Sequence, residues 1–341
     1  MKKLILIIII LSFNKYVFSH DLFISSFIDV EFVSNNIEDT KILKINQIKK
    51  ESLKKILKKI LNHEKYNQVS SDLSADLINS LIKNVIINDE NIINNKYFSK
   101  IKVNFNKKKL INYFREKNIP YVEYYPKKFL LIIYEYNNIN ENLFTKINNF
   151  YLFYKKNKEK DGLFKIPNLD INDRFILKKE DIKNRNIDKI NNFSNKYNFK
   201  ETVIVIIKTS KNKIVYDLIL HSGGQIAEKK IELKNNDYDK FFEKLEFESL
   251  NIWKTINEIQ NSSLNNINCK INYFNMIELK EIRDNLNNVS IIKNLKKKSL
   301  SFRSIEYDIS YYGNLKILTK IFKLNKLNIS NYQNDCFIRL I

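Results

Sequence analysis

The residues of this chain best suited to chemistry are a histidine and the serine beside it. His221 and Ser222 precede Gly223 and Gly224, and a histidine that deprotonates a serine is the usual way to make a hydroxyl nucleophile. However, neighbouring side chains of a strand point to opposite faces, and no G-x-S-x-G elbow surrounds Ser222. We therefore expect Ser222-Gly223-Gly224 to be a hairpin turn, in which glycine supplies the positive φ angle.

Metal and cofactor chemistry lack a matching pattern. The three histidines, His20, His63 and His221, fall in different expected elements, without paired spacing and without a cysteine cluster. Only four glycines occur, too few for a Walker loop or a dinucleotide-binding fingerprint. We accordingly predict no catalytic, metal-binding or cofactor-binding residues, and a protein that is not an enzyme.

Asp170, Asp173 and Arg174 form a second polar group. On a surface loop, these charged side chains would suit an interaction site. Alternatively, Asp170 is the N-cap of a helix and Arg174 is paired locally, because an aspartate oxygen can accept hydrogen bonds from free first-turn N–H groups. We favour the cap and keep the interaction site as the alternative.

Tyr121, Tyr124 and Tyr125 lie in a short extended linker between Pro120 and Pro126. Clustered tyrosines are typical of contact surfaces, because the ring is apolar and the hydroxyl is polar. The same residues can instead pack two domains together, and this is the interpretation that we favour.

Cys269 and Cys336 are the two cysteines, and both fall near the C-terminal end of the chain. An exported protein would be expected to join them. In a ferredoxin-like sheet, however, the first and last strands are antiparallel neighbours. That register offsets the two cysteines by about four residues, or roughly 13 Å, beyond the ~7 Å Cα limit of a disulfide. We therefore expect two buried free thiols, with the disulfide as the alternative.

The elements that must hold these residues form three groups, and the overall class is α+β. The first group, residues 21–119, is expected to be a strand-helix-helix-hairpin-helix domain. Alternation from Tyr97 to Phe105 predicts a strand with one apolar face. Its elements in chain order are a strand at 23–34, a helix at 40–61, a helix after Ser70 or Ser71, strands at 85–93 and 97–105 joined by an Asn94-Asn95 turn, and a helix after Asn106.

The second group, residues 120–262, is expected to be a central α/β domain of three layers. The apolar run Phe129–Tyr134 predicts a strand buried on both faces. Helices are expected at 141–155, 188–197 and 237–260, and further strands at 202–208, 213–220 and 224–233. The third group, residues 265–341, has the order βαββαβ of a ferredoxin-like unit, whose last strand is expected at 335–340.

Composition sets the charge and limits the partners. The 341 residues are 44% hydrophobic and carry a formal net charge of +21. Lysine supplies most of this charge, whereas arginine, the residue favoured for bidentate phosphate and base contacts, is rare. Lys, Ile, Asn, Tyr and Phe are the residues that A/T-rich codons specify, so we expect no nucleic-acid partner. A basic surface still suits anionic lipids or glycans.

The first residues have the pattern of a secretory signal peptide. Lys2 and Lys3 precede the apolar run Leu4–Phe13, and Val17-Phe18-Ser19 suits cleavage after Ser19. A helix of this run would be about 15 Å long, half of the ~30 Å hydrocarbon core, so a membrane-spanning anchor is not expected. We predict that residues 1–19 are a signal peptide, that the mature chain has no transmembrane segment, and that it is periplasmic.

Several segments resemble one bacterial family in their order and spacing. A long helix containing LKKILKKILNH is followed by Val103-Asn104-Phe105, by a helix at Leu110–Phe114 and by Asn118-Ile119-Pro120-Tyr121. Further on, Pro167 to Arg174 has a proline, two residues, an aspartate, two residues and an Asp-Arg pair. This layout resembles the exported envelope proteins catalogued as domain of unknown function 2066. The resemblance implies export and an architecture, and it implies no particular activity.

These observations together predict an exported, periplasmic, non-enzymatic protein that binds or scaffolds components of the cell envelope. Its expected partner is an envelope protein or an anionic envelope polymer. Two alternatives stay open. The first is an envelope hydrolase whose carboxylates are too dispersed to recognise, and the second is a binder of anionic lipid or glycan that uses the basic surface.

Overall fold

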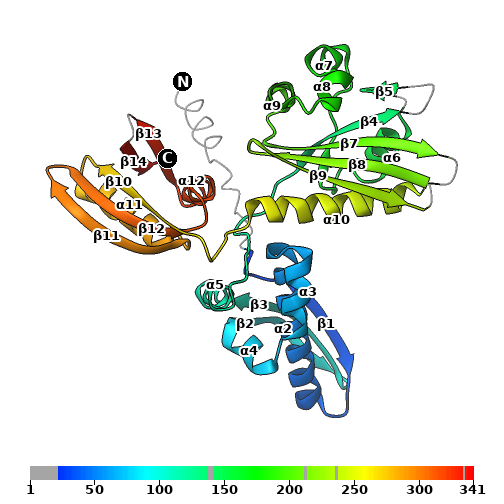
Figure 1. Cartoon of the computed structure of the whole chain (residues 1–341). Coiled ribbons are helices and arrows are strands. Elements are labelled where there is room, and N and C mark those ends of the chain that lie inside the picture. Colours follow the sequence, from blue (N-terminus) through cyan, green and yellow to red (C-terminus); the bar gives the residue numbers. More distant parts are fainter. Residues whose placement is uncertain (1–21, 137–140, 147, 211–212, 235–236, 333–334) are drawn as a thin grey trace, which may run out of the picture. The chain divides into compact units, whose positions relative to one another are not determined.

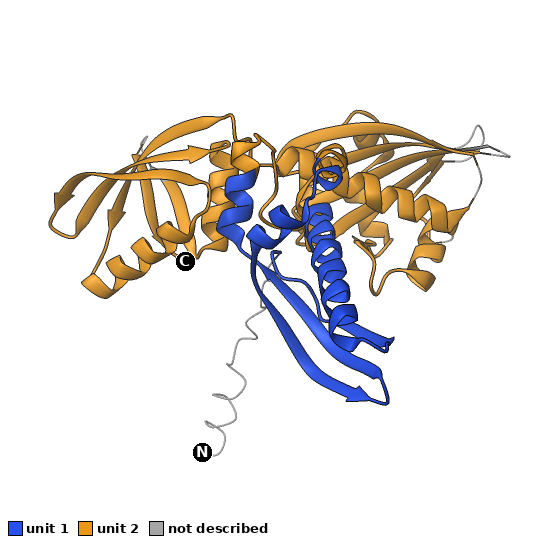
Figure 2. Ribbon diagram, turned by 90° about the horizontal axis from the view of Figure 1, so that it is seen from below, with its two compact units in different colours: residues 1–59, 69–113 blue, residues 60–68, 114–341 orange. Residues whose placement is uncertain are grey.

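The chain folds into mixed helices and strands with three separate sheets (Figure 1). The computed structural model describes residues 22–136, 141–146, 148–210, 213–234, 237–332 and 335–341. The predicted signal peptide, residues 1–19, therefore lies outside the described residues. The chain divides into two compact units, residues 1–59 with 69–113 and residues 60–68 with 114–341 (Figure 2). The expected three-domain boundaries stay a prediction.

Unit 1 contains an antiparallel sheet with the strand order β1-β3-β2. The central strand shows the predicted alternation, because Tyr97, Ser99 and every second residue after them are buried. Asn94 and Asn95 have φ angles of 47° and 59°, so the predicted tight turn is confirmed. The elements are β1 (Ile28–Val33), β2 (Ile82–Ile93), β3 (Lys96–Phe105) and α4 (Ala75–Leu81), with α2 (Ile37–Ile60), α3 (His63–Ser71) and α5 (Lys107–Glu116) containing residues of both units.

Residues 60–68 belong to unit 2 because they bond to its segments. The Val122 N–H donates to the Ile60 carbonyl at 2.9 Å. The His63 N–H donates to Asn251 Oδ1 at 2.7 Å, and Lys254 Nζ donates to the Leu61 carbonyl at 3.0 Å. Both of these partners lie on α10 (Tyr238–Asn257), the long helix that was expected at 237–260.

The central sheet of unit 2 has the strand order β5-β4-β7-β8-β9, with β6 pairing β4. β4 is parallel to β6 and β7, and the other pairs are antiparallel. The first six residues of β4 are all buried, as the apolar run predicted. The strands are β4 (Phe129–Tyr136), β5 (Glu141–Leu143), β6 (Phe164–Lys165), β7 (Glu201–Ser210), β8 (Lys213–Ser222) and β9 (Gln225–Leu233).

Helices cover both faces of this sheet. Ile190 and Phe193 of α9 pack with Ile204 and Ile219 on one face, and Phe241 of α10 lies edge-on to Tyr216 on the other. The helix expected at 141–155 begins later than predicted, because Asn148 is its N-cap and residues 141–143 pair with β4 instead. The remaining helices are α6 (Asn149–Asn157), α7 (Ile171–Ile176), α8 (Lys179–Lys183) and α9 (Ile187–Lys196).

The C-terminal sheet of unit 2 corrects the expected βαββαβ order. An additional strand, β13, follows the second helix, and β14 enters the sheet between β10 and β13. β13 is easily missed because three of its six residues are asparagine or serine. The elements are β10 (Leu264–Asn272), α11 (Met276–Asn288), β11 (Ile292–Ser301), β12 (Ser304–Tyr312), α12 (Leu315–Leu324), β13 (Leu327–Tyr332) and β14 (Asp335–Leu340).

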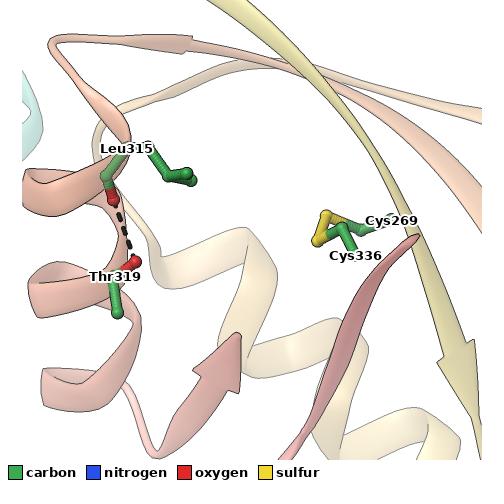
Figure 3. Close-up of a disulfide and its surroundings, with 4 residues drawn as sticks. All are labelled: Cys269, Leu315, Thr319 and Cys336. Carbon is green, nitrogen blue, oxygen red and sulfur yellow. Dashed lines mark hydrogen bonds between the residues drawn. A yellow bond between two sulfur atoms is a disulfide. The ribbon is translucent and has the colours of Figure 1, made fainter. Parts of the chain in front are cut away.

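The two cysteines form a disulfide, so the expectation of free thiols is wrong. β14 is parallel to β10 rather than antiparallel, because β13 reverses the chain once more before β14. This direction places Cys269 directly opposite Cys336, with their Cα atoms 4.5 Å apart. Figure 3 shows the disulfide together with the start of α12, where the Thr319 hydroxyl donates to the Leu315 carbonyl at 2.9 Å.

Candidate functional site

His221 and Ser222 lie at the end of β8 and lead into the predicted hairpin turn, which is confirmed. Ser222 pairs with Gln225, and Gly223 and Gly224 have φ angles of 53° and 83°. On the other side of β8, Ser222 lies opposite Glu201 and His221 lies opposite Thr202. The two side chains of a possible base and nucleophile therefore alternate across the sheet, as expected for neighbours in a strand.

Ser222 belongs to a buried polar cluster centred on Asn257, the last residue of α10. The Asn257 Nδ2 group donates to Ser222 Oγ at 3.3 Å and to the Trp253 carbonyl at 2.8 Å. Its Oδ1 atom accepts from the Tyr124 hydroxyl at 2.8 Å and from Lys320 Nζ at 2.7 Å. One buried amide thus joins the linker, the end of β8, α10 and α12.

A second lysine of α12 contacts the same region. Lys316 Nζ donates to the Ser222 carbonyl at 3.2 Å and to Gln225 Oε1 at 3.1 Å, so it bridges the ends of β8 and β9. We call Tyr124, Ser222, Asn257, Lys316 and Lys320 the Asn257 cluster. Burial lowers the pKa of both lysines, and the nearby carboxylate of Glu201 opposes that shift.

His221 lies on the opposite face of the sheet from this cluster. Its side chain is 2% exposed, and within the described residues neither ring nitrogen has a hydrogen-bond partner. Burial lowers the pKa of the imidazole, while the Glu201 carboxylate opposes this and Lys316 adds to it. The ring is therefore biased towards its neutral form, which costs less to bury than a cation.

The three linker tyrosines pack onto α10 and the residues that follow it. Tyr121 is buried, lies 5.3 Å from the Phe114 ring, and accepts a backbone hydrogen bond from Ile259 at 2.7 Å. The Tyr124 ring lies edge-on to Trp253 at 5.1 Å, and the Lys320 ammonium lies 5.5 Å from the Tyr124 ring centre. Tyr125 is the most exposed of the three, at 39%, and partial desolvation of its hydroxyl, with the nearby Glu246 carboxylate, raises its pKa to about 12.

Asp170, Asp173 and Arg174 begin α7, and the favoured cap interpretation is confirmed for Asp170. Asp170 Oδ1 accepts from the Asp173 N–H at 2.9 Å, and Asp173 Oδ2 accepts from the Asp170 N–H at 3.3 Å. Asp173 is fully buried and also accepts from Lys196 Nζ and the Tyr197 hydroxyl, both at 2.7 Å. Arg174 was expected to pair with these neighbours. Among the described residues its guanidinium instead donates to the more distant Phe144 carbonyl at 3.3 Å.

Sequence reasoning missed three members of the Asn257 cluster: Asn257, Lys316 and Lys320. The available signal was weak. Lys316 and Lys320 are four residues apart on α12, next to the buried stripe of Ile317 and Ile321, a spacing that places the two ammonium groups on one helix face. A solvated lysine pair would show the same pattern, so only the fold identifies their partners.

In the part of the chain that the structure describes, no group of three or more His, Cys, Asp and Glu side chains is arranged to hold a metal ion. None of the helices in the same part of the chain combines the length and the apolar character needed to cross a membrane.

A scan against protein-family models gives no match, and a search of curated proteins gives no match either. The resemblance described above stays a prediction.

Proposed function

We propose that this chain is an exported, periplasmic, non-enzymatic protein that serves as a binding or scaffold component of the cell envelope. The observation that supports export is the buried Cys269–Cys336 disulfide. Disulfides form and persist in oxidising compartments such as the periplasm, and they are rare in the cytosol. The signal-peptide pattern of residues 1–19 leads to the same compartment independently.

The observation that supports a scaffold is the way in which reactive groups are used in the Asn257 cluster. Ser222 is fully buried and accepts from Asn257, while Lys320 donates to the same amide. These groups join four segments of unit 2. A fixed arrangement of this kind suits a protein that presents surfaces to partners.

An envelope hydrolase is the alternative, and Ser222 with His221 would be its natural starting point. A nucleophilic serine must reach both its base and the substrate. Ser222 and His221 lie on opposite faces of β8, and both are buried. This geometry favours the scaffold proposal over the hydrolase.

The decisive experiment has two parts. Cell fractionation with N-terminal sequencing should find a chain that begins at His20, is oxidised at both cysteines and is recovered in the periplasm. Crosslinking in intact cells should then join it to an envelope protein or to an anionic envelope polymer. Recovery from the cytoplasm with an uncleaved N-terminus would refute export, whereas turnover of an envelope ester or amide that is lost in Ser222→Ala would refute the non-enzymatic role.

A further inference from the structure

One end of the C-terminal sheet exposes five large apolar side chains, which come from the β10–α11 connection with the start of α11 and from the β11–β12 turn with the end of β11. β10 ends at Asn272 opposite Ser304, and the Tyr273 N–H donates to the Arg303 carbonyl at 3.1 Å. The connection from β10 to α11 therefore lies beside the turn from β11 to β12. We call the exposed residues the apolar tip: Phe274 (81% exposed), Met276 (69%), Ile277 (80%), Leu300 (61%) and Phe302 (88%).

The turn that contains Phe302 has residues that are unusual in two-residue hairpin turns. Two-residue turns favour asparagine and glycine, because positive φ angles strain other side chains. The turn before β3 has Asn94-Asn95, and the turn before β9 has Gly223-Gly224. The β11–β12 turn instead has Phe302-Arg303, and Arg303 has a φ angle of 56°. Residues that break a local rule in this way are commonly kept for function.

Cationic side chains accompany the apolar tip. The Arg303 guanidinium lies 5.2 Å from the Phe302 ring centre, and Lys296, Lys297 and Lys298 are exposed on β11 just before the turn. Beside Met276, an open hollow of about 250 Å³ is lined by α11 residues that include Lys280, Arg283 and Asp284. Residues 264–341 as a whole contain thirteen Lys and Arg against six Asp and Glu.

The lysines of β11 have a second explanation, because charges on an edge strand discourage pairing with another sheet. That explanation accounts for the lysines and leaves the exposed phenylalanines unexplained. Of the acidic groups near the tip, Glu278 accepts from the Phe274 N–H at 2.7 Å, and Glu306 accepts from Ser299 Oγ at 3.1 Å and lies 3.4 Å from Lys298 Nζ. Together with Asp284 they are outnumbered by the nearby cations Lys280, Arg283, Lys296, Lys297, Lys298 and Arg303. The tip therefore combines apolar side chains with a local excess of positive charge.

We infer that the apolar tip inserts into the interface of a lipid bilayer that carries anionic headgroups. Apolar side chains can enter the boundary between headgroups and acyl chains, while nearby lysine and arginine stay at the level of the phosphates. A second copy of the chain is a poorer occupant, because a symmetric contact through the tip would bring two sets of cations together. The inference uses the proposed export only to name the membrane, and it stands apart from the scaffold role.

The test uses residues 20–341, so that the apolar run Leu4–Phe13 cannot bind vesicles by itself. Co-sedimentation is measured with vesicles of phosphatidylcholine alone and with vesicles that contain phosphatidylglycerol. We expect binding to the anionic vesicles that weakens at least about tenfold in the double variant Phe274→Ser with Phe302→Ser, from the lost burial of two rings. The matched control is Phe175→Ser on α7, a phenylalanine that is 73% exposed and should leave binding unchanged.

Two further variants separate insertion from misfolding and from simple charge attraction. Replacing Phe302-Arg303 by Asn-Gly gives the turn its favoured residues, so weaker vesicle binding with undiminished stability would support the inference. Phe302→Trp adds an exposed indole to a chain whose single tryptophan, Trp253, is buried. Its fluorescence should shift to shorter wavelength when anionic vesicles are added.

Three results would overturn the inference. The first is equal binding by wild type and by the double phenylalanine variant. The second is binding that 0.5 M salt abolishes while the Phe302→Trp emission stays unshifted, as expected for attraction without insertion. The third is a dimer in sedimentation velocity that dissociates in the tip variants and does not bind vesicles. None of these results would bear on export, which is tested by fractionation.

Discussion

Cys269 of β10 and Cys336 of β14 lie directly opposite each other on two parallel strands and are joined by a disulfide. The bond connects residues that are 67 positions apart in the sequence. It links the first strand of the C-terminal sheet to the last one, so most of that sheet and both of its helices lie within the closed loop.

The first prediction concerns the stability that this disulfide contributes. Loop-closure entropy for a separation of this size predicts a contribution of about 4 kcal/mol to the free energy of unfolding. Replacing both cysteines by serine should therefore lower the urea midpoint strongly. Reductant should lower the midpoint of the wild type and leave the double variant unchanged. Thiol titration of the denatured, unreduced wild type should find no free thiol, and two thiols per chain would contradict the structure.

A second prediction follows from the central amide of the Asn257 cluster. Asn257→Ala removes the acceptor of Lys320 and Tyr124 and the donor to Ser222. Leaving such buried groups without partners should cost about 2 kcal/mol of folding free energy, measured by urea unfolding. Asn172→Ala, at an exposed position of α7, is the control and should change stability by less than about 0.5 kcal/mol. Equal effects of the two substitutions would show that the Asn257 cluster does not contribute to the stability of the fold.

A third prediction separates the carboxylates at the start of α7. Asp170→Ala removes a helix cap and should cost about 1 kcal/mol. Asp173→Ala leaves Lys196 and Tyr197 without their buried acceptor and should cost about 3 kcal/mol or more. Chemical denaturation of the two variants gives the comparison. The order would be reversed if Asp170 were the structural centre of this group.

A fourth prediction concerns the pH dependence caused by His221. Its pKa is lowered by burial in the folded protein, so the unfolded chain takes up a proton more readily as the pH falls below the ordinary value of 6.5. Titration of His221 therefore leaves the free energy of unfolding unchanged at higher pH. On acidification it lowers the free energy of unfolding, by at most about 1.4 kcal/mol per pH unit. His221→Leu should flatten this part of the pH profile between pH 7.5 and 5. A profile of His221→Leu that is as steep as that of the wild type would contradict this assignment.

A fifth prediction concerns the turn at Phe302-Arg303. The Asn-Gly replacement removes the strain of a non-glycine residue at a φ angle of 56°. We expect the free energy of unfolding to rise by about 0.5–1 kcal/mol. A fall in stability would mean that the contact between Arg303 and Phe302, 5.2 Å from guanidinium to ring centre, outweighs the strain.

Local patterns were sufficient for the strands of unit 1 and for the central strands, whereas the helix expected after Ser70 or Ser71 begins after its N-cap Ser74 and is preceded by α3. The alternation from Tyr97 to Phe105, the apolar run after Phe129 and the turns at Asn94-Asn95 and Gly223-Gly224 all form as expected. In each case the preference lies within a few neighbouring residues. Such local preferences can be predicted without knowing which segments of the chain are in contact in the folded protein.

Partners that are far apart in the sequence could not be predicted in the same way. The disulfide depends on the direction of β14, which depends in turn on whether β13 exists. β13 has only Leu327 and Ile329 as its apolar alternation before Ser330, a pattern that a loop can also show. The partners of Asn257 come from three other elements, so its role appears only once those elements are packed together.

The position of β14 has a consequence for how the protein is assembled. β14 is the strand of this sheet that is synthesised last, and it does not join the sheet at an edge, since it lies between β10 and β13. The sheet therefore stays divided until residues 335–340 have arrived. A non-local pairing of this kind is slow compared with helix or hairpin formation. If the chain is exported from its N-terminus, Cys269 must stay a thiol until Cys336 has crossed, so the disulfide can form only after the 67 residues that separate the two cysteines have been translocated.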